Sequence, residues 1–305
     1  MPTRRSQETL NMIRSHKKTA MEFGMDWLMR VNPTADTVAK IRMSGTRADP
    51  VRGLGMPALM LSPRKTEVED GAILHPHGGA FVSGGILQCR AIASPICSAA
   101  GVKTLTFSYR LAPRCPYPAQ LEDAMRAYRY LMDLGYAPEK IALVGESAGG
   151  NLALALALKL RDAGKPLPAA IALMSPWVDL AQTGESYALL ADVDATLDAE
   201  SLMEDALAYA GSPGRLTDPE ISPVYADFSG FPPVLIHCGT SEILLSDSEM
   251  LEKKLLDGGV DAQIVRWAGM CHVFQAFGFT ESRVSISQIG AFLLKALREG
   301  KTDEE

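Results

Sequence analysis

The feature that most constrains this chain is an apolar strand that runs through a glycine-rich turn directly into an apolar helix. Ile141–Val144 predicts the strand, Gly145-Glu-Ser-Ala-Gly149 the turn, and Asn151–Ala157 the helix. Gly-x-Ser-x-Gly alone arises by chance in roughly one chain in ten of this length, but the strand–turn–helix context is that of a nucleophile elbow. Such a tight turn pushes the hydroxyl of Ser147 outward, and the helix start places N–H groups beside a developing negative charge.

The rest of the chain repeats this alternation of short strands and helices. Strands are predicted over Thr37–Met43, Met56–Leu61, Ala72–His75, Lys103–Phe107, Ile141–Val144, Ala170–Met174, Val234–Cys238 and Gln263–Trp267. Helices are predicted over Ser6–Arg30, Leu87–Ala100, Ala119–Leu134, Gly149–Ala163, Ala199–Tyr209, Ser246–Gly258 and Ser282–Arg298. From the third strand onward this is the rhythm of an α/β protein with a mostly parallel sheet, whose crossovers should be right-handed.

One segment, Asp179 to Tyr225, interrupts the alternation. It holds a single predicted helix and no predicted strand. Because it lies between two strands and is too long for a simple connection, we expect an insertion over the sheet.

Composition and charge exclude several classes of protein. The net charge is −6, and no basic run extends beyond Arg4-Arg5 and Lys17-Lys18, which argues against a nucleic-acid partner. The longest apolar run, Leu152–Leu158, is far short of the ~20 residues that cross a bilayer. The polar start, Met1–Lys18, lacks the apolar stretch of a secretory signal, so we expect a cytoplasmic protein that is not associated with a membrane. The five cysteines form no CxxC pair and are expected to be free thiols.

A second glycine-rich turn, His77–Phe81, follows the third predicted strand. Acyl transfer creates a negatively charged oxygen in the transition state, and each fixed N–H donor aimed at it is worth roughly 3 kcal/mol. The loop after the third strand supplies such donors in a serine hydrolase of this fold. We therefore expect an oxyanion hole made by the N–H groups of Gly79, Ala80 and Ala148, with Gly78 shaping the loop.

His272 is the expected general base, which a serine nucleophile requires. The chain has five histidines. His16 lies in the charged N-terminal segment. His75 and His77 belong to the glycine-rich loop, and His237, at the end of a strand, is interpreted as a core histidine. The remaining one, His272, follows the last predicted strand, and the chain order serine, acid, histidine is that of α/β-hydrolases.

The acid of the triad should follow the seventh predicted strand, where the sequence offers Glu242 and Asp247. Glu242 comes directly after the strand end and can reach His272. Asp247 falls where the next helix begins, which is also a favourable position for a carboxylate that only stabilises the helix dipole. We favour Glu242, and Asp247 stays open as the alternative.

Four blocks in this order give the chain a resemblance to the bacterial hormone-sensitive-lipase-like (family IV) esterases. They are His77-Gly-Gly-Ala-Phe81; Tyr109-Arg-Leu-Ala-Pro113 with Pro118 and Glu122-Asp123; Gly145-Glu-Ser-Ala-Gly-Gly-Asn151; and Gly269-Met-Cys-His-Val-Phe274. The chain departs from the family at Ala80, where a third glycine is usual, at Glu146, where Asp is more common, and at Cys115, where His is common. The family acid is often Asp in an Asp-Pro-Leu run, and the aligned residue here is Glu242.

The resemblance covers nearly the whole chain and implies an α/β-hydrolase fold with a sheet of about eight strands. It implies a single domain over residues 1–305 with a helical cap from about residues 1–45 and 179–225, and a preference for short acyl esters. We expect the Met-rich segment Met21–Met29 to form part of the acyl-pocket wall. No metal or organic cofactor is implied.

The predicted function is that of a carboxylesterase acting on small-molecule esters through Ser147, His272 and Glu242. A lactone hydrolase using the same triad is the nearest alternative. A non-catalytic binding protein is the alternative from another class, since plant gibberellin receptors resemble this family and have lost the catalytic histidine. Retention of His272 disfavours that reading. The sequence leaves the natural ester and the oligomer open, with a homodimer as a candidate.

Overall fold

The computed structural model describes residues 2–4, 6–11, 13–14 and 45–299, which contain an eight-stranded sheet. Its strands are β1 (Thr46–Pro50), β2 (Ala58–Pro63), β3 (Ala72–Pro76), β4 (Lys103–Phe107), β5 (Ile141–Glu146), β6 (Ile171–Met174), β7 (Val234–Gly239) and β8 (Ala262–Trp267). Their spatial order is β1-β2-β4-β3-β5-β6-β7-β8. Strand β2 is antiparallel to both neighbours and every other pair is parallel.

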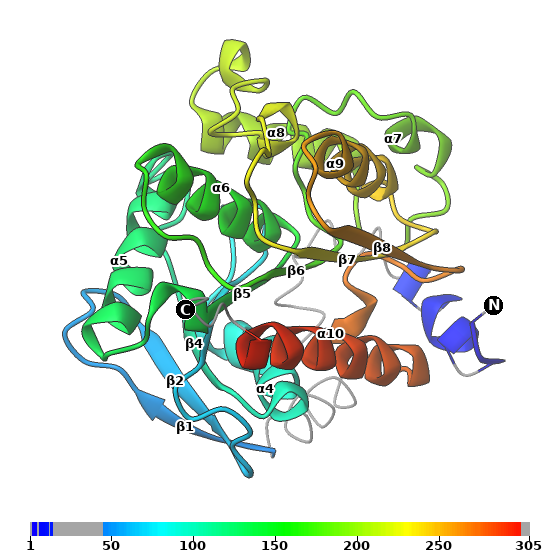
Figure 1. The fold of residues 1–305 in the computed structure, drawn as a ribbon. Helices are drawn as coiled ribbons and strands as arrows, with labels where there is room; N and C mark the ends of the chain where they lie inside the picture. Colours follow the sequence, from blue (N-terminus) through cyan, green and yellow to red (C-terminus); the bar gives the residue numbers. More distant parts are fainter. Residues whose placement is uncertain (1, 5, 12, 15–44, 300–305) are drawn as a thin grey trace.

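Helices cover both faces of this sheet (Figure 1). They are α4 (Ile86–Ala100), α5 (Ala119–Asp133), α6 (Ala148–Asp162), α7 (Ser186–Leu189), α8 (Ala199–Ala210), α9 (Leu245–Asp257) and α10 (Thr280–Glu299), with short 3-10 turns at Pro138–Lys140, Pro213–Arg215, Pro223–Tyr225 and Phe274–Ala276. Helices α4 and α10 lie together on one face, and α5, α6 and α9 lie on the other. The predicted α/β-hydrolase fold, with its mostly parallel sheet, is therefore confirmed.

The sequence predicted most of these elements but missed the first strand. Strand β1 has the sequence Thr-Arg-Ala-Asp-Pro and no apolar run. It forms because its backbone pairs with β2 at the sheet edge, where polar residues and a proline are tolerated. The predicted strand Thr37–Met43 and the Met-rich segment Met21–Met29 lie outside the described residues.

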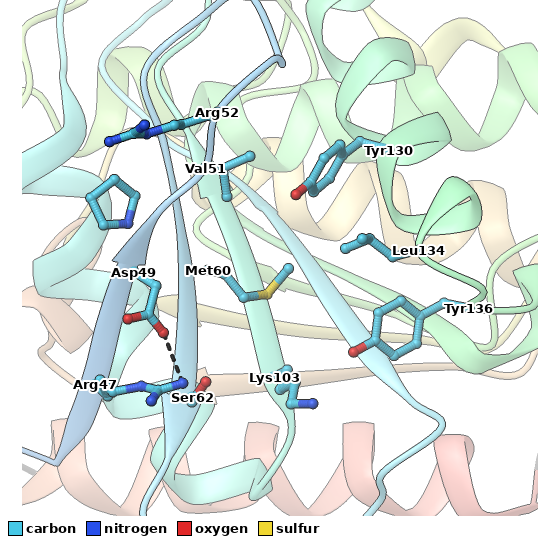
Figure 2. Close-up of a pocket in the computed structure, with 11 residues that line it drawn as sticks. Arg47, Asp49, Val51, Arg52, Met60, Ser62, Lys103, Tyr130, Leu134 and Tyr136 are labelled. Carbon is cyan, nitrogen blue, oxygen red and sulfur yellow. Dashed lines mark ion pairs between the residues drawn. The ribbon is translucent and has the colours of Figure 1, made fainter.

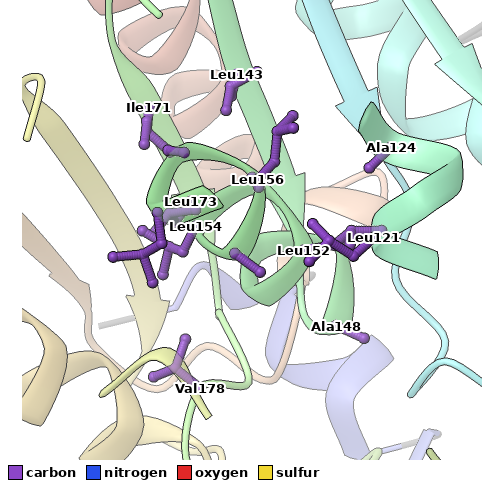
Figure 3. Close-up of a cluster of buried hydrophobic side chains, with 14 of the residues drawn as sticks. Leu121, Ala124, Leu143, Ala148, Leu152, Leu154, Leu156, Ile171, Leu173 and Val178 are labelled. Carbon is purple, nitrogen blue, oxygen red and sulfur yellow. The ribbon is translucent and has the colours of Figure 1, made fainter. Parts of the chain in front are cut away.

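Helix α6, which follows the nucleophile turn, is buried on nearly all sides. Its Leu-Ala repeat provides apolar side chains all around the helix rather than along one stripe, and Leu152, Leu154 and Leu156 are fully buried. They pack among side chains of α5, β5 and β6 (Figure 3). Each such leucine contributes roughly 1.5–3 kcal/mol by leaving water, so the packing fixes the start of α6.

The parallel strands direct the candidate site residues to one edge of the sheet. The carboxyl ends of β3, β5, β6, β7 and β8 meet at this edge because the strands are parallel neighbours. The glycine-rich loop, Ser147, Ser175, Glu242 and His272 follow these strand ends in the same order.

Two segments outside the sheet pack close to this edge. The insertion between β6 and β7 carries α7 and α8 and has no strand among its described residues, as predicted. Its Tyr209 stacks on Phe81 with ring centroids 3.7 Å apart. Near the N-terminus, the buried Leu10 packs in one apolar cluster with Met270 and Phe274, on either side of His272.

Candidate active site

Ser147 lies in a strained turn between β5 and α6. Its backbone adopts φ 54° and ψ −125°, a region that a non-glycine residue occupies only when its surroundings enforce it. The turn is enforced by hydrogen bonds from the Ser147 N–H to the Met174 carbonyl (3.0 Å) and from the Trp177 N–H to the Ser147 carbonyl (3.1 Å). A side chain at Gly145 would collide with the Gly149 carbonyl, so the close approach of strand and helix requires glycine.

His272 and Glu242 form a hydrogen-bonded pair at the ends of β8 and β7. The His272 Nδ1 lies 2.8 Å from the Glu242 Oε2. Glu242 is fully buried, and its other oxygen, Oε1, accepts hydrogen bonds from the Gly239 N–H (2.6 Å) and the Ser175 hydroxyl (2.8 Å). The acid therefore fixes the imidazole through Nδ1 and leaves Nε2 as the ring nitrogen that can face a nucleophile.

Strand β6 ties the nucleophile turn to the histidine loop. Met174, its last residue, accepts the hydrogen bond from the Ser147 N–H. The next residue, Ser175, accepts a hydrogen bond from the Val273 N–H (3.1 Å), next to His272. Ser147 and His272 are only 7% and 9% exposed, so both sit in a nearly closed site.

The structure places Asp247 apart from the histidine. In the first turn of α9, its Oδ2 accepts hydrogen bonds from the N–H groups of Val178 (2.8 Å) and Asp179 (2.9 Å). Burial raises the pKa of Asp247 well above its usual value. This carboxyl group therefore holds the chain that leaves β6, and the geometry favours Glu242 as the partner of His272.

In the glycine-rich loop after β3, one backbone N–H group donates to a protein acceptor, and others have no acceptor among the described residues. The Gly78 N–H donates to the Glu146 Oε1 (2.8 Å), so it shapes the loop. Among the hydrogen bonds of the described residues, none is donated by the N–H groups of Gly79, Ala80 or Ala148. These are the donors expected to meet an oxyanion.

Glu146, which directly precedes Ser147, belongs to a buried network that the sequence did not reveal. Its Oε2 lies 2.8 Å from the His75 Nε2, and the His75 Nδ1 lies 2.9 Å from the Thr106 hydroxyl. Burial alone would raise the pKa of Glu146, but the nearby His75 and the Gly78 N–H outweigh it and hold this pKa below its usual value. His75 lies in β3, directly below the loop. The sequence offered two separate signals, a histidine at the end of an apolar strand and a Glu where Asp is more common. We assigned His75 to the glycine-rich loop, and the structure instead places it in β3, where it pairs with Glu146.

The two remaining described histidines have structural contacts. His77 stacks on Tyr109, with ring centroids 4.0 Å apart and nearly parallel rings, and burial lowers its pKa to about 4. His237 contacts the Ser285 hydroxyl at 2.8 Å, and burial lowers its pKa to about 4 as well. Both rings are therefore neutral near pH 7, and His237 agrees with its interpretation as a core histidine.

A groove of about 600 Å³ lies away from these residues, beside β1 and β2 (Figure 2). Its lining includes Met60, Tyr130 and Tyr136 and none of the candidate site residues. In the described part of the chain, no group of three or more His, Cys, Asp or Glu side chains could hold a metal ion. None of the helices formed by the described residues is long and apolar enough to cross a membrane.

Known proteins resemble this chain in both sequence and fold. Residues 73–276 match the family model described as the alpha/beta hydrolase fold. An acetyl-hydrolase of Streptomyces hygroscopicus is 39% identical over 236 residues, which span 76% of this chain and 78% of that protein. An esterase of Acinetobacter venetianus is 32% identical over 272 residues, which span 88% and 86%. The crystal structure of an esterase from the bacterial hormone-sensitive lipase family superposes with a TM-score of 0.84 at 34% identity, covering 97% and 99% of the two chains.

The chain therefore belongs to the α/β-hydrolase fold family. Within that family it is a serine carboxylic ester hydrolase of the bacterial hormone-sensitive-lipase type, and the predicted resemblance is confirmed.

Proposed function

We propose that this esterase hydrolyses small carboxylic esters of short acyl groups through a covalent acyl-enzyme formed on Ser147. The observation that carries the proposal is the His272–Glu242 pair at 2.8 Å, held at the same sheet edge as the strained serine turn. A buried carboxylate beside Nδ1 fixes the tautomer in which Nε2 can take a proton, and it stabilises the imidazolium that forms.

In the first step, His272 removes the proton of the Ser147 hydroxyl while its oxygen attacks the substrate carbonyl. The negative charge on the carbonyl oxygen is met by the N–H groups of Gly79, Ala80 and Ala148, which have no protein acceptor among the described residues. His272 then protonates the departing alcohol. In the second step it activates a water molecule, which releases the acid and restores the serine.

A bounded acyl site supports the preference for short acyl groups. We propose that the insertion at residues 179–225 and the N-terminal residues to about 45 form a cap over this site. The contact between Tyr209 of the insertion and Phe81 of the glycine-rich loop and the packing of Leu10 beside the His272 loop support it. The name of the Streptomyces relative, an acetyl-hydrolase, agrees with a small acyl group.

The test is Ser147→Ala. Loss of the nucleophile should lower kcat for p-nitrophenyl acetate by about 10⁴-fold or more, with the melting temperature nearly unchanged because only one hydroxyl group is removed. Retention of even a tenth of the parental rate would overturn the serine mechanism.

We also propose a cytoplasmic enzyme that acts without nucleic acid or membrane, with a homodimer as the candidate oligomer. The acidic net charge of −6 supports the absence of a nucleic-acid partner, which would need a clustered positive surface. Cell fractionation and light scattering of the purified protein test the two expectations separately.

A further inference from the structure

Ser175, the residue that directly follows β6, combines features that an ordinary buried serine does not need. It is fully buried, and its backbone adopts φ 48°. Because a non-glycine residue in this region is strained, the surrounding contacts must hold it there. Its N–H donates to the His237 carbonyl at 2.7 Å, which fixes the strand exit.

The Ser175 hydroxyl connects Glu242 to the backbone next to His272. It donates to the Glu242 Oε1 at 2.8 Å and accepts from the Val273 N–H at 3.1 Å. The Glu242 Oε2 is the atom that contacts His272. One hydroxyl therefore sets the rotation of the carboxylate and also the backbone position directly after the imidazole.

The backbone conformation of Val273, directly after His272, depends on its hydrogen bond to the Ser175 hydroxyl. Val273 adopts φ 45°, which is a genuine outlier for a β-branched residue. The hydrogen bond from its N–H to Ser175 is one of the contacts that oppose relaxation. Relaxation at Val273 would turn the His272 ring away from the acid.

We propose that Ser175 is a positioning residue for the esterase reaction: its hydroxyl orients Glu242 and the backbone that carries His272. This proposal rests on the function proposed above. Ser175 does not contact substrate, and it acts only through the acid–histidine pair. Its loss should therefore lower kcat and leave KM almost unchanged, because ground-state binding of the ester is untouched.

The test compares Ser175→Ala and Ser175→Gly with Ser285→Ala. Ser285 is a matched control because its hydroxyl is also fully buried and also bridges two side chains, His237 (2.8 Å) and Gln275 (3.0 Å). With p-nitrophenyl acetate we expect a roughly 10- to 100-fold fall in kcat for both Ser175 variants. Loss of a hydrogen-bond partner that orients a functional side chain has an effect of this size at metal sites. For Ser285→Ala we expect kcat within about twofold at a similar loss of melting temperature. Because glycine relieves the strain at φ 48° and alanine does not, equal kcat values for the two variants assign the effect to the hydroxyl.

A double-mutant cycle separates positioning from simple structural support. In a Glu242→Gln background, Ser175→Ala should cost less than about twofold in kcat, since residues that act as a unit are non-additive. If the two effects multiply, or if Ser175→Ala matches the parent while Glu242→Gln is inactive, the positioning role is wrong and the triad stands. If Glu242→Gln itself retains the parental rate, the proposed triad is the part that fails.

Discussion

At the scale of single residues, backbone strain is concentrated at the candidate site. Non-glycine residues with positive φ include Ala80, Phe81, Ser147, Ser175 and Val273, and all of these lie in the glycine-rich loop, the nucleophile turn or the contacts around His272. Strained backbone persists only where the surrounding structure over-determines it. In this enzyme, the buried helix α6 and the hydrogen-bonded carboxylates of Glu146 and Glu242 supply that support.

Glu242 and Asp247 should respond differently to replacement by their amides. Glu242→Gln leaves His272 poorly oriented and in the wrong tautomer, so we expect kcat to fall by about 10⁴-fold with a small change in melting temperature. Asp247→Asn keeps an acceptor for Val178 and Asp179, whose N–H groups it binds. Its kcat should stay within several-fold of the parent. Stopped-flow kinetics and melting curves of both variants, measured together, decide the matter: a larger kcat defect in Asp247→Asn would identify it as the acid.

Glu146 should make the folding stability of the enzyme depend on pH. Its pKa in the folded protein lies below the ordinary 4.5, so its stabilising contribution is complete above that value and is lost as the pH falls through the folded-state pKa. Glu146→Gln breaks a buried pair with His75 and should cost about 3 kcal/mol at pH 7. The difference in melting temperature between parent and variant should therefore shrink below pH 4.5.

A suitable control for that titration is Glu249→Gln. Glu249 pairs with Arg266 at 2.8 Å, but both side chains are more than a third exposed, so the variant should cost less than about 1 kcal/mol. A melting-temperature difference for Glu146→Gln that stays constant from pH 7 to pH 3.5 would contradict a charged Glu146 in the folded state.

At the scale of elements, segments from distant parts of the sequence hold the loops that carry the acid and the histidine. Asp194, in the insertion, accepts a hydrogen bond from the Ile243 N–H (2.8 Å), next to Glu242. Ser6 donates to Glu281 at 2.8 Å and ties the N-terminal segment to the start of α10. The insertion therefore holds the loop after β7, which carries Glu242, and the N-terminal segment is fixed to the start of α10.

The N-terminal segment should protect the His272 loop. Leu10 is 1% exposed and packs against Met270 and Phe274, so Leu10→Ala leaves a cavity in a cluster that has few other members. We expect faster amide exchange in residues 2–14 and in the loop after β8, with a fall in kcat. Asn11→Ala is the matched control because Asn11 is exposed on the same segment. Unchanged exchange in the loop of Leu10→Ala would show that the segment does not support it.

At the scale of the whole molecule, the sequence predicted those features that a short stretch of residues determines by itself. Apolar strands, the Leu-Ala helix α6 and the short glycine-rich motifs are local signals, and they indicated the fold, Ser147 and His272. The contacts of Ser175 with Glu242 and of Gly78 with Glu146 join residues that are 67 and 68 positions apart. Such contacts depend on strand order and on side-chain rotation, which no short pattern encodes. Strand β1 was missed for a related reason, since it is stabilised by pairing with β2 rather than by its own sequence.

The last prediction concerns the acyl group that the whole molecule accepts. Phe81, the last residue of the glycine-rich loop, is fully buried and stacks on Tyr209 of the insertion with ring centroids 3.7 Å apart. The space beside the oxyanion donors is therefore bounded by packed aromatic rings. We expect kcat/KM for p-nitrophenyl acetate and butyrate to exceed that for the decanoate by about tenfold or more, since each methylene that fits no pocket gains no transition-state binding.

Lactones measured in the same series separate the two hydrolase functions. The proposed acyl-enzyme releases its alcohol before water attacks, so an open-chain ester needs room for a leaving group, whereas a lactone keeps its alcohol attached to the acyl chain. We expect δ-valerolactone to have a kcat/KM at least about tenfold below that of ethyl butyrate, a non-activated ester. The opposite order would identify a lactone hydrolase with the same triad, and a maximum at the decanoate would contradict the short acyl site. Ser147→Ala in each assay shows that the measured turnover belongs to this site.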